Sequence, residues 1–550
     1  MRSRSRWATL STTSFSRVPA GPIAPGSSPP WPGSSATMMM RSVWRAVATE
    51  GRAGAGVPRD VVQLLPGQGE TVGAALVGDA RVQGVLFTGS TDVARILQRA
   101  LGQRLGRNGQ PVPLVAETGG QNAMIVDSSA LAEQVVADVV ASAFDSAGQR
   151  CSALRVLCLQ DDCADRVIEM LEGAIAQSRI GDPAQLAVDI GPVIDAPARD
   201  GIEAHIEQMR AKGRKVVRTA WNADDAVLAR GTFVLPTLIT LDSIAELQRE
   251  IFGPVLHIVR YRRKDLAQLL AQINATGYGL TLGLHTRIDE TIAQVVGAAH
   301  AGNVYVNRNM VGAVVGVQPF GGEGLSGTGP KAGGPLYLYR LLSQRPDDVL
   351  QRALPARADA APAPQRWQAE SALAQLRQWA AQSGRPQLVT ACTHLQALAH
   401  GQDAWELQGP TGERNVYTLA PRAAVLCLAA NDEDRLTQLA AVLAVGSRAV
   451  WPASALALHA RLPLAVQQAI DLVRDWSTDS LAFDAVLHHG DAASLRQANQ
   501  ALAARPGPIV GIGHAASGSI AVPLERLVIE RALSVNTAAA GGNASLMTIA

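Results

Sequence analysis

The sequence predicts an α/β protein, because short apolar strands alternate with amphipathic helices along most of the chain. Residues 82–90 (VQGVLFTGS) are typical of a buried strand that ends in a turn, and residues 91–101 (TDVARILQRAL) are typical of the helix after it. The alternation continues further along the chain, with strands expected at 113–117, 122–127 and 153–160 and helices at 130–144 and 164–180. Strands and helices that alternate at this spacing favour βαβ units around a parallel sheet.

The composition indicates a globular protein with more than one domain. The chain has 550 residues, of which 47% are hydrophobic and 17% are charged. This length is enough for roughly two to four domains, each with its own core. A formal net charge of +2 gives no reason to expect nucleic-acid binding. The apolar runs stop well short of the roughly 20 residues that span a bilayer, so we expect no membrane span.

The cysteines point to a reducing location. There are five of them, they form no CxxC pair, and they are too sparse for a disulfide scaffold. They are Cys151, Cys158, Cys163, Cys392 and Cys427. We therefore expect a soluble, cytoplasmic protein, and we predict no metal site.

Residues 1–55 differ from the rest of the chain. They are rich in Ser, Pro and Arg, contain no acidic residue before Glu50, and lack helical or strand periodicity. Such leaders are typical of transit peptides, but an unstructured or wrongly assigned start explains the same composition. We interpret 1–55 as disordered and unrelated to the remainder of the protein. The abrupt change near Gly56 suggests the hypothesis that a change of reading frame has replaced part of the chain.

Two turns at strand ends carry candidate functional residues. In FTGST, Gly89 and Ser90 lie between a strand and a helix, where free N–H groups favour a phosphate, although such turns are also common without a ligand. In ETGGQNA, Glu117 follows an apolar strand and precedes Gly119 and Gly120, which permit a sharp turn. Burial there would raise the pKa of the carboxyl towards neutrality, as a general base requires. An isolated glutamate of this kind is otherwise a helix cap or a surface acid.

Cys151 is a candidate nucleophile because it stands at the mouth of the strand expected at 153–160. Arg150 beside it and a nearby helix N-terminus would favour the reactive thiolate. A free cysteine is otherwise a small buried hydrophobe, and that interpretation suits the other four cysteines.

The order of these motifs resembles that of the aldehyde dehydrogenase superfamily. FTGST comes first, Glu117 and Cys151 come next, and four further segments then appear in the order that the family uses: EIFGPV, GYGLTLGLHT, GNVYVNRN and PFGGEGLSGTG. The resemblance runs from about Gly56 to about Leu341. It implies an incomplete Rossmann-type NAD-binding domain over 56–118 and an α/β catalytic domain with a substrate-anchoring loop over 119–345.

The resemblance also implies roles for single positions. Cys151 would attack the aldehyde carbon and carry first a thiohemiacetal and then a thioester. Glu117 would activate the water that hydrolyses the thioester. The backbone N–H of Cys151 would supply one donor to the oxyanion. The cofactor would be NAD, and the residues that bind it, from its pyrophosphate to its nicotinamide, would be Gly89, Ser90, Glu250 and Phe252.

The motifs GQRCSA and GEGLSGTGPKAGGP resemble one branch of the superfamily. That branch oxidises L-glutamate γ-semialdehyde, the hydrolysed form of 1-pyrroline-5-carboxylate, to L-glutamate. Ser152 and Ser326, with the Gly327 N–H, would cradle the α-carboxylate of this substrate. Phe144 and Phe320 would wall its aliphatic middle. Alternatively, the glycine-rich stretch is only a flexible loop.

The last third of the chain resembles the corresponding part of the proline utilization A family of bifunctional proline catabolic enzymes. After an Ala/Pro-rich linker at 346–365, residues 366–550 are expected to form a second, dehydrogenase-like α/β domain. The resemblance implies that this domain has no catalytic role. It also implies that tail residues 536–543 help to close the cavity between two active sites. We expect a homo-oligomer.

The chain also departs from these families. Upstream of GVPRDVVQLLPG it lacks the family's Trp-Asn pair, whose asparagine completes the oxyanion hole, and the Lys-Pro-Ala-Glu segment, whose lysine meets the adenosine ribose. Its first asparagine is Asn108 and its first lysine is Lys212. The flavin-dependent portion is missing as well, so proline oxidation is not predicted. Two functions remain: a truncated and impaired NAD-dependent dehydrogenase of proline catabolism, or a non-catalytic remnant that acts as a folding or interaction module.

Overall fold

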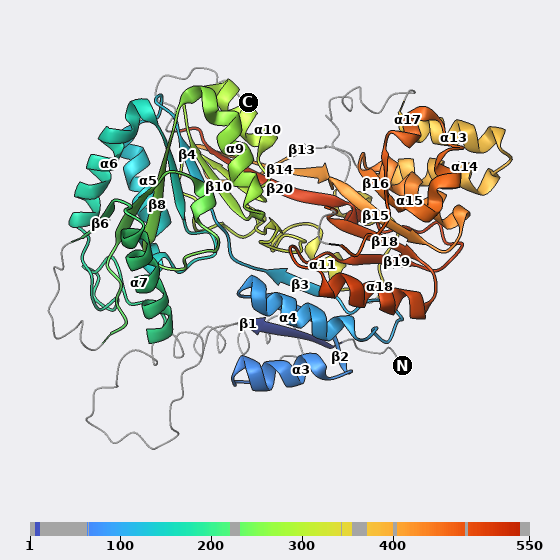
Figure 1. The fold of residues 1–550 in the computed structure, drawn as a ribbon, viewed down its shortest axis with the longest axis horizontal. Coiled ribbons are helices and arrows are strands. Elements are labelled where there is room, and N and C mark those ends of the chain that lie inside the picture. The colour runs from blue at the N-terminus through green and yellow to red at the C-terminus, as the bar shows by residue number, and fades with distance from the viewer. Residues whose placement is uncertain are drawn as a thin grey trace.

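The computed structural model describes residues 65–219, 231–342, 344–354, 371–399, 404–478 and 482–538, together with Gln63 and the strand Arg6–Ser11. Its strands form sheets of three, ten, two and five strands, with helices packed around them (Figure 1). The predicted α/β class is therefore confirmed. None of the helices in these ranges is long and apolar enough to cross a bilayer.

The three-stranded sheet, in the order β1-β2-β3, carries the first two motifs. Strands β2 (Val82–Thr88) and β3 (Leu114–Glu117) pair in parallel, and α4 (Thr91–Gly102) connects them. A short helix, α3 (Ala74–Gly78), precedes β2. Apolar side chains of β2 and α4 form a small core of their own, so the two motifs at the ends of β2 and β3 stand on a packed support.

Strand β1 (Arg6–Ser11) pairs in parallel with β2, with Arg6 opposite Val82 and Ser11 opposite Thr88. No strand was expected in residues 1–55, so the expectation of a disordered leader is wrong for this segment. The physical reason is that a strand edge offers N–H and C=O groups with which an extended segment pairs whatever its side-chain pattern. The other residues before Gln63 lie outside the described residues, and so does the proposed change of reading frame.

The ten-stranded sheet is the centre of the molecule, in the order β13-β14-β20-β11-β10-β4-β5-β8-β7-β6. The strands from β20 to β7 are parallel, and β13, β14 and β6 are antiparallel to their neighbours. In the order of the sheet, the strands are β13 (Ala404–Leu407), β14 (Glu413–Pro421), β20 (Val528–Asn536), β11 (Asn303–Val306), β10 (Thr281–His285), β4 (Ala123–Val126), β5 (Val156–Gln160), β8 (Val255–Tyr261), β7 (Thr237–Leu241) and β6 (Val216–Arg218).

Helices cover this sheet and bury its central strands. Every residue of β4 and β5 is buried, as is typical of parallel strands with both faces covered. The helices that share a core with these strands are α5 (Ala132–Phe144), α6 (Asp161–Ala176), α7 (Ala196–Ala211), α9 (Leu266–Ala275) and α10 (Asp289–Ala298). A two-stranded ribbon of β9 (Tyr278–Gly279) and β12 (Glu323–Gly324) lies beside the sheet. The loop that carries Cys151 therefore leads into a fully buried strand, β5.

A second, five-stranded parallel sheet lies in the C-terminal unit, in the order β17-β16-β15-β18-β19. Numbered along the chain this is 3-2-1-4-5, the order of nucleotide-binding α/β domains. The strands are β15 (Ala424–Ala429), β16 (Arg448–Pro452), β17 (Ile470–Val473), β18 (Ala485–His489) and β19 (Ile512–Ala515). The helices are α11 (Tyr337–Arg340), α12 (Val349–Ala353), α13 (Ala372–Gln382), α14 (Pro386–Leu398), α15 (Asp432–Ala444), α16 (Leu456–His459), α17 (Leu464–Gln467) and α18 (Ala492–Ala504).

The place where such a domain would hold a phosphate is occupied by carboxylates. The first turn of α15 consists of Asp432, Glu433 and Asp434. The buried Asp434 carboxylate accepts hydrogen bonds from the Ser517 hydroxyl and from the Gly518 N–H at 2.7 Å. Negative charge at a helix N-terminus satisfies the free N–H groups and repels an anion. The C-terminal unit thus keeps the nucleotide-binding topology without a phosphate site at this helix.

Three strands of the predicted C-terminal domain, β13, β14 and β20, belong to the sheet of the catalytic domain. β20 pairs in parallel with β11 along 303–306 and antiparallel with β14 along its whole length (Figure 1). The unit expected at 366–550 therefore continues the catalytic sheet with β13, β14 and β20, and only β15 to β19 form a separate sheet. Pairing between strands more than two hundred residues apart leaves no local trace in the sequence.

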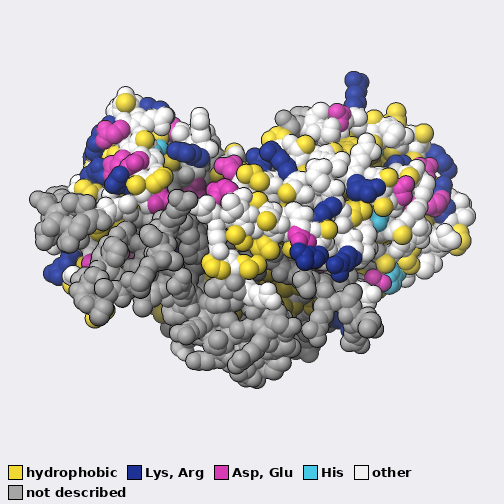
Figure 2. Space-filling view, turned by 90° about the horizontal axis from the view of Figure 1, so that it is seen from below, with side chains coloured by type: hydrophobic (Ala, Val, Ile, Leu, Met, Phe, Trp, Pro, Cys, Tyr) yellow, Lys and Arg dark blue, Asp and Glu magenta, His cyan; other side chains and the backbone are white. Residues whose placement is uncertain are grey.

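The underside of the molecule carries no continuous basic surface within its described part. In Figure 2, Lys and Arg side chains on this face are scattered between acidic, apolar and uncharged ones. A scattered charge pattern of this kind fits the small net charge of the chain.

Removing β20 tests its place in the sheet. We expect a chain ended after Leu527 to aggregate or to unfold at a lower temperature, because β11 and β14 lose their shared partner and expose two strand edges. A chain ended after Ala538 keeps β20 and serves as the control. Thermal unfolding of the two purified proteins makes the comparison, and equal midpoints would contradict the structural role given to β20.

Candidate active site

Cys151 lies just after a tight turn at the end of α5. Ser146 and Ala147 have φ of 56° and 53°, and Gly148 has φ of 65°. A Cβ at Gly148 would lie 2.2 Å from the Gly253 carbonyl oxygen, so only glycine fits there. The turn leaves Cys151 half-buried, before the start of β5. The sequence prediction of a cysteine at the mouth of a strand is confirmed.

Asn122 fixes the backbone on which Cys151 stands, and the sequence reasoning missed it. Its Nδ2 donates to the carbonyl oxygens of Cys151 at 2.7 Å and Ala153 at 2.9 Å. Its Oδ1 accepts from the Thr281 N–H at 3.2 Å. A buried asparagine with three partners holds the loop by hydrogen bonds. The signal in the sequence was an amide side chain between a glycine pair and a buried strand.

The surroundings of Cys151 do not favour the thiolate in the free protein. Burial raises the pKa of the Cys151 thiol, and the negative charges of Glu117 and Glu250 raise it further. Arg150, which was expected to lower this pKa, donates its Nε to the Ser146 hydroxyl at 3.1 Å. That expectation is wrong, because the guanidinium is engaged by the turn. The thiol therefore needs a base to remove its proton.

Glu117, the last residue of β3, has the raised pKa that the sequence predicted. Its Oε2 accepts from the Gly322 N–H at 3.1 Å, and its backbone forms a bridge with Gly327. Its Oε1 is buried with no hydrogen-bond partner in the described part of the chain. Burial raises the pKa of this carboxyl to about 8, against the lowering effects of the Gly322 N–H and Lys331. A carboxyl of that pKa suits a general base at neutral pH.

The charge of Glu117 acts on Cys151. The charge of Glu117 is one of the causes that raise the pKa of Cys151, second only to burial. Such an influence is strongest between groups that lie in one poorly solvated region. It supports the prediction that the nucleophile and the base, which come from separate strand ends, act in one site.

Glu250 and Phe252 lie on the other side of the cysteine loop, and a buried arginine ties them to it. Arg155 donates through Nε and Nη2 to Glu250 Oε1 at 3.2 and 3.0 Å, and through Nη1 to the Gly148 carbonyl at 2.7 Å. Its guanidinium lies 5.0 Å from the ring centre of Phe252, which is 43% exposed. Arg155, which the sequence reasoning missed, fixes the loop of Glu250 to the loop of Cys151.

Gly89 and Ser90 form the turn between β2 and α4. The Gly89 N–H donates to the Glu117 carbonyl at 3.2 Å, and the Ser90 hydroxyl accepts from the Val93 N–H at 3.3 Å. Ser90 is exposed and caps the helix. The turn therefore connects the candidate phosphate position to the strand that carries the base.

The predicted substrate residues fall into two groups. Phe144 and Ser326 are fully buried, Phe144 in the core of the large sheet and Ser326 with its hydroxyl accepting from the Gly279 N–H at 3.1 Å. Their contacts are therefore contacts of the fold. Ser152 lies next to Cys151, and Phe320 lies beside Ala332, with which it exchanges backbone hydrogen bonds. Gly327 lies against Glu117.

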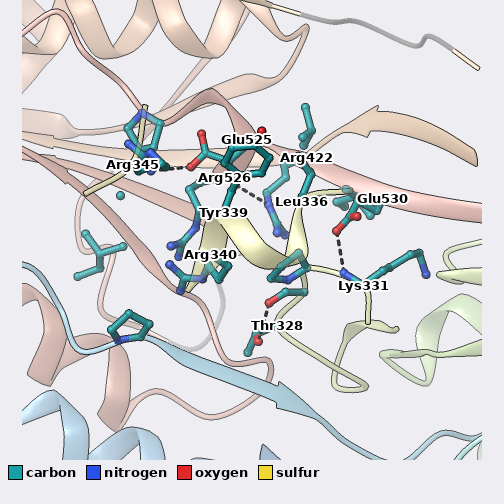
Figure 3. A pocket seen from close by; sticks show the side chains of 18 of the residues that line it. Thr328, Lys331, Leu336, Tyr339, Arg340, Arg345, Arg422, Glu525, Arg526 and Glu530 are labelled. Carbon is teal, nitrogen blue, oxygen red and sulfur yellow. Dashed lines mark hydrogen bonds and ion pairs between the residues drawn. The ribbon is translucent and has the colours of Figure 1, made fainter. Parts of the chain in front are cut away.

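A buried network behind Glu117 was not predicted. Lys331 Nζ donates to Asn303 Oδ1 at 2.8 Å and to the Gly321 carbonyl at 2.5 Å, and its backbone N–H donates to Glu530 Oε2 at 2.8 Å (Figure 3). Glu530 Oε1 accepts from the Tyr417 hydroxyl at 2.9 Å. Burial lowers the pKa of Lys331 to about 8 and raises the pKa of Glu530. Since Glu530 belongs to β20, the C-terminal unit supports the loop that donates to Glu117.

No cluster of three or more metal-ligating side chains occurs among the described residues. All five cysteines are unpaired. The site offers a thiol and a carboxyl for chemistry.

The chain belongs to the aldehyde dehydrogenase family, which it matches over residues 34–345, more than half of its length. The match begins inside the leader, ahead of the start near Gly56 that the motifs indicated.

Individual relatives extend this similarity to the C-terminal unit. The chain is 62% identical over 503 residues to the bifunctional protein PutA of Escherichia coli (strain K12), across 90% of this chain and 38% of that protein. It is 40% identical over 287 residues to the 1-pyrroline-5-carboxylate dehydrogenase of Geobacillus kaustophilus (strain HTA426), across 52% of this chain and 54% of that one. A variant of Bradyrhizobium japonicum proline utilization A of known structure is 51% identical, with a TM-score of 0.51 over 55% of this chain and 30% of that chain. The chain thus spans well under half the length of its PutA relatives.

The raised pKa of Glu117 predicts a pH-dependent stability difference between the wild type and Glu117→Gln. A carboxyl whose folded-state pKa lies above its unfolded value of 4.5 stabilises the fold below that value, and this contribution is lost as the pH rises to about 8. Each pKa unit corresponds to about 1.4 kcal/mol. The variant should therefore gain stability relative to the wild type as the pH rises. Urea unfolding of both proteins between about pH 5 and 9 measures this, and a pH-independent difference would rule out the raised pKa.

Proposed function

We propose that this chain oxidises L-glutamate γ-semialdehyde to L-glutamate with NAD, in the cytoplasm, as a step of proline catabolism. The observation that carries the proposal is the half-buried thiol of Cys151 in one site with the buried carboxyl of Glu117. Membership of the aldehyde dehydrogenase family supports the reaction class. The names of the PutA and 1-pyrroline-5-carboxylate dehydrogenase relatives support the substrate.

Carbon–sulfur bond formation begins with removal of the Cys151 proton. Only the thiolate is nucleophilic, and the pKa of this thiol is raised, so a base must act. Glu117 is suited to accept the proton, since its own pKa is about 8. The sulfur then bonds to the aldehyde carbon and the carbonyl oxygen takes the negative charge, which gives a thiohemiacetal.

The oxyanion needs donors aimed at the oxygen of the carbon that is bound to sulfur. The backbone N–H groups of Ser152 and Cys151 already act on the sulfur, where they lower its pKa. Donors fixed in advance beside the reacting atom stabilise charge as it develops. These two N–H groups are the oxyanion donors that we propose for this chain.

Hydrolysis of the thioester uses Glu117 a second time. Its Oε1 has no partner among the described residues, so it is the atom able to hold a water. The proton that Glu117 took from Cys151 first passes to bulk solvent. The restored carboxylate then takes a proton from this water as the water oxygen bonds to the thioester carbon. The carbon–sulfur bond then breaks, glutamate leaves, and the Cys151 thiolate is restored.

Two of the residues proposed for NAD, Ser90 and Phe252, are exposed. Ser90 caps α4, where the remaining N–H groups of the first turn favour a pyrophosphate. Phe252 is 43% exposed, and the neighbouring Glu250 keeps an acceptor beside it. When bound, NAD supplies the acceptor for the hydride that the thiohemiacetal loses. Gly89 keeps the turn close to Glu117 through its backbone hydrogen bond.

Substrate selection would depend on the loop after β11 and on the residue after the nucleophile. Ser152 and the Gly327 N–H are the polar groups proposed for the α-carboxylate, and Phe320 is the apolar wall. Ser326 would act indirectly, since its hydroxyl holds the loop to Gly279. Phe144 would act indirectly too, as core packing beneath the cysteine turn. A homo-oligomer stays a prediction.

Formation of NADH from the semialdehyde tests the proposal. We expect Cys151→Ala to abolish the reaction while saturable NAD binding, followed by quenching of protein fluorescence, is kept. Cys163→Ala is the matched control, because Cys163 is also a half-buried thiol but lies on α6. A wild-type chain that binds NAD and forms no NADH would overturn the proposal, and so would Cys151→Ala with wild-type turnover.

A further inference from the structure

A cavity of about 270 Å³ lies where the three parts of the chain meet. The catalytic loop at 322–331 forms one side of it, and residues 108–113 next to β3 form another. The C-terminal unit closes it with residues of β19 and β20 and the turn between them. The cavity is separate from the thiol of Cys151, which does not line it.

Four arginines line this cavity, and we call them the arginine pocket. Figure 3 shows Arg340, Arg345 and Arg526 together on one side of the cavity, with Arg422 between them and Glu530. They come from α11, from the segment after it, from the end of β14 and from the turn before β20: Arg340, Arg345, Arg422 and Arg526. Four separate chain segments therefore bring guanidinium groups to one place.

One carboxylate among the lining residues, that of Glu525, forms an ion pair with one of these arginines, and the charge of Arg422 also acts on Glu530. Arg345 Nη1 donates to Glu525 Oε1 at 2.5 Å, which neutralises one of the four charges. Arg422 donates through Nε to the Arg526 carbonyl at 2.9 Å and lies 3.8 Å from Asp484 Oδ2. The cavity's other charged groups have partners of their own: Lys331 Nζ donates to Asn303 Oδ1 and to the Gly321 carbonyl, Glu530 accepts from the Lys331 backbone N–H, and Glu323 lies 3.3 Å from Arg531.

The guanidinium groups of Arg340 and Arg526 form no hydrogen bond or ion pair within the described part of the chain. Burial lowers the pKa of Arg340 to about 10; the charge of Glu525 opposes this shift, and the charges of Arg345 and Arg422 add to it. Burial and Arg340 lower the pKa of Arg526. The Glu525 carboxylate is thus the nearby negative charge for several buried guanidinium groups, of which two have no hydrogen-bonded partner of their own, and a bound anion would offset the cost of their burial.

We propose that the arginine pocket binds a small polyanion that carries two phosphate or carboxylate groups. Guanidinium forks bind the oxygens of such groups in pairs, and two unpaired forks provide for two groups. The volume suits a small molecule, because it lies near the lower limit of about 300 Å³ for ligand pockets. The inference does not depend on the aldehyde chemistry.

Binding of inorganic pyrophosphate to the full chain, followed by isothermal titration calorimetry, tests the proposal. We expect one saturable site per chain and an affinity that falls by at least about tenfold in Arg526→Gln and in Arg340→Gln, because each variant removes one unpaired fork. Arg448→Gln is the control, since Arg448 is an exposed arginine of the same unit paired with Asp471. It removes one positive charge away from the cavity and should leave the affinity unchanged.

Three outcomes would overturn the proposal: no saturable heat with pyrophosphate, the same loss of affinity in Arg448→Gln as in the pocket variants, or binding of a short acidic peptide in place of pyrophosphate. Both pocket variants relieve repulsion, so both should fold, and circular dichroism checks this. If one of them fails to fold, the other decides the result. Formation of NADH by Arg526→Gln, measured without pyrophosphate, separates this test from that of the proposed function.

Discussion

The site depends on one constraint: a carboxyl must stay buried at the end of β3 without an arginine partner. Glycines around Glu117 make this possible, because a Cβ at Gly321 or Gly327 would lie about 3 Å from its oxygens. The glycine N–H and the more distant Lys331 keep the pKa of the carboxyl near 8, within reach of neutral pH. A closer cation would hold it ionised and too weak as a base. The pKa of the neighbouring Cys151 thiol is raised as well, so a base of raised pKa stands beside a thiol of raised pKa.

This constraint explains why the C-terminal unit is joined to the catalytic sheet. The loop that donates to Glu117 is held by Lys331, and the Lys331 backbone is held by Glu530 on β20. β20 in turn lies between β11 and β14, so the support of the base comes from the far end of the chain. The five-stranded sheet has the strand order of nucleotide-binding domains, but the first turn of α15 consists of acidic residues. The C-terminal unit therefore contributes to the site structurally, because its strands β13, β14 and β20 join the ten-stranded sheet.

Local patterns predicted the features that depend on local sequence. The alternation of strands and helices predicted the fold class, and the ends of β3 and the approach to β5 predicted the positions of Glu117 and Cys151. Features that join distant segments were missed, such as Arg155 with Glu250 and Lys331 with Glu530, because their partners lie 95 and 199 residues apart. The expected influence of Arg150 was wrong for a related reason. The direction of the Arg150 side chain depends on the turn that carries it, and in this turn its guanidinium donates to the Ser146 hydroxyl.

The central claim is that Cys151 and Glu117 share one poorly solvated space, and alkylation of Cys151 tests it most directly. The rate with iodoacetamide, read for this cysteine alone by peptide mass spectrometry, follows the thiolate fraction as the pH rises. Removing the Glu117 charge lowers the pKa of the thiol, because that charge is one of the causes that raise it. The account predicts that Glu117→Gln moves the midpoint of the profile to lower pH. Identical profiles for the wild type and the variant would contradict it.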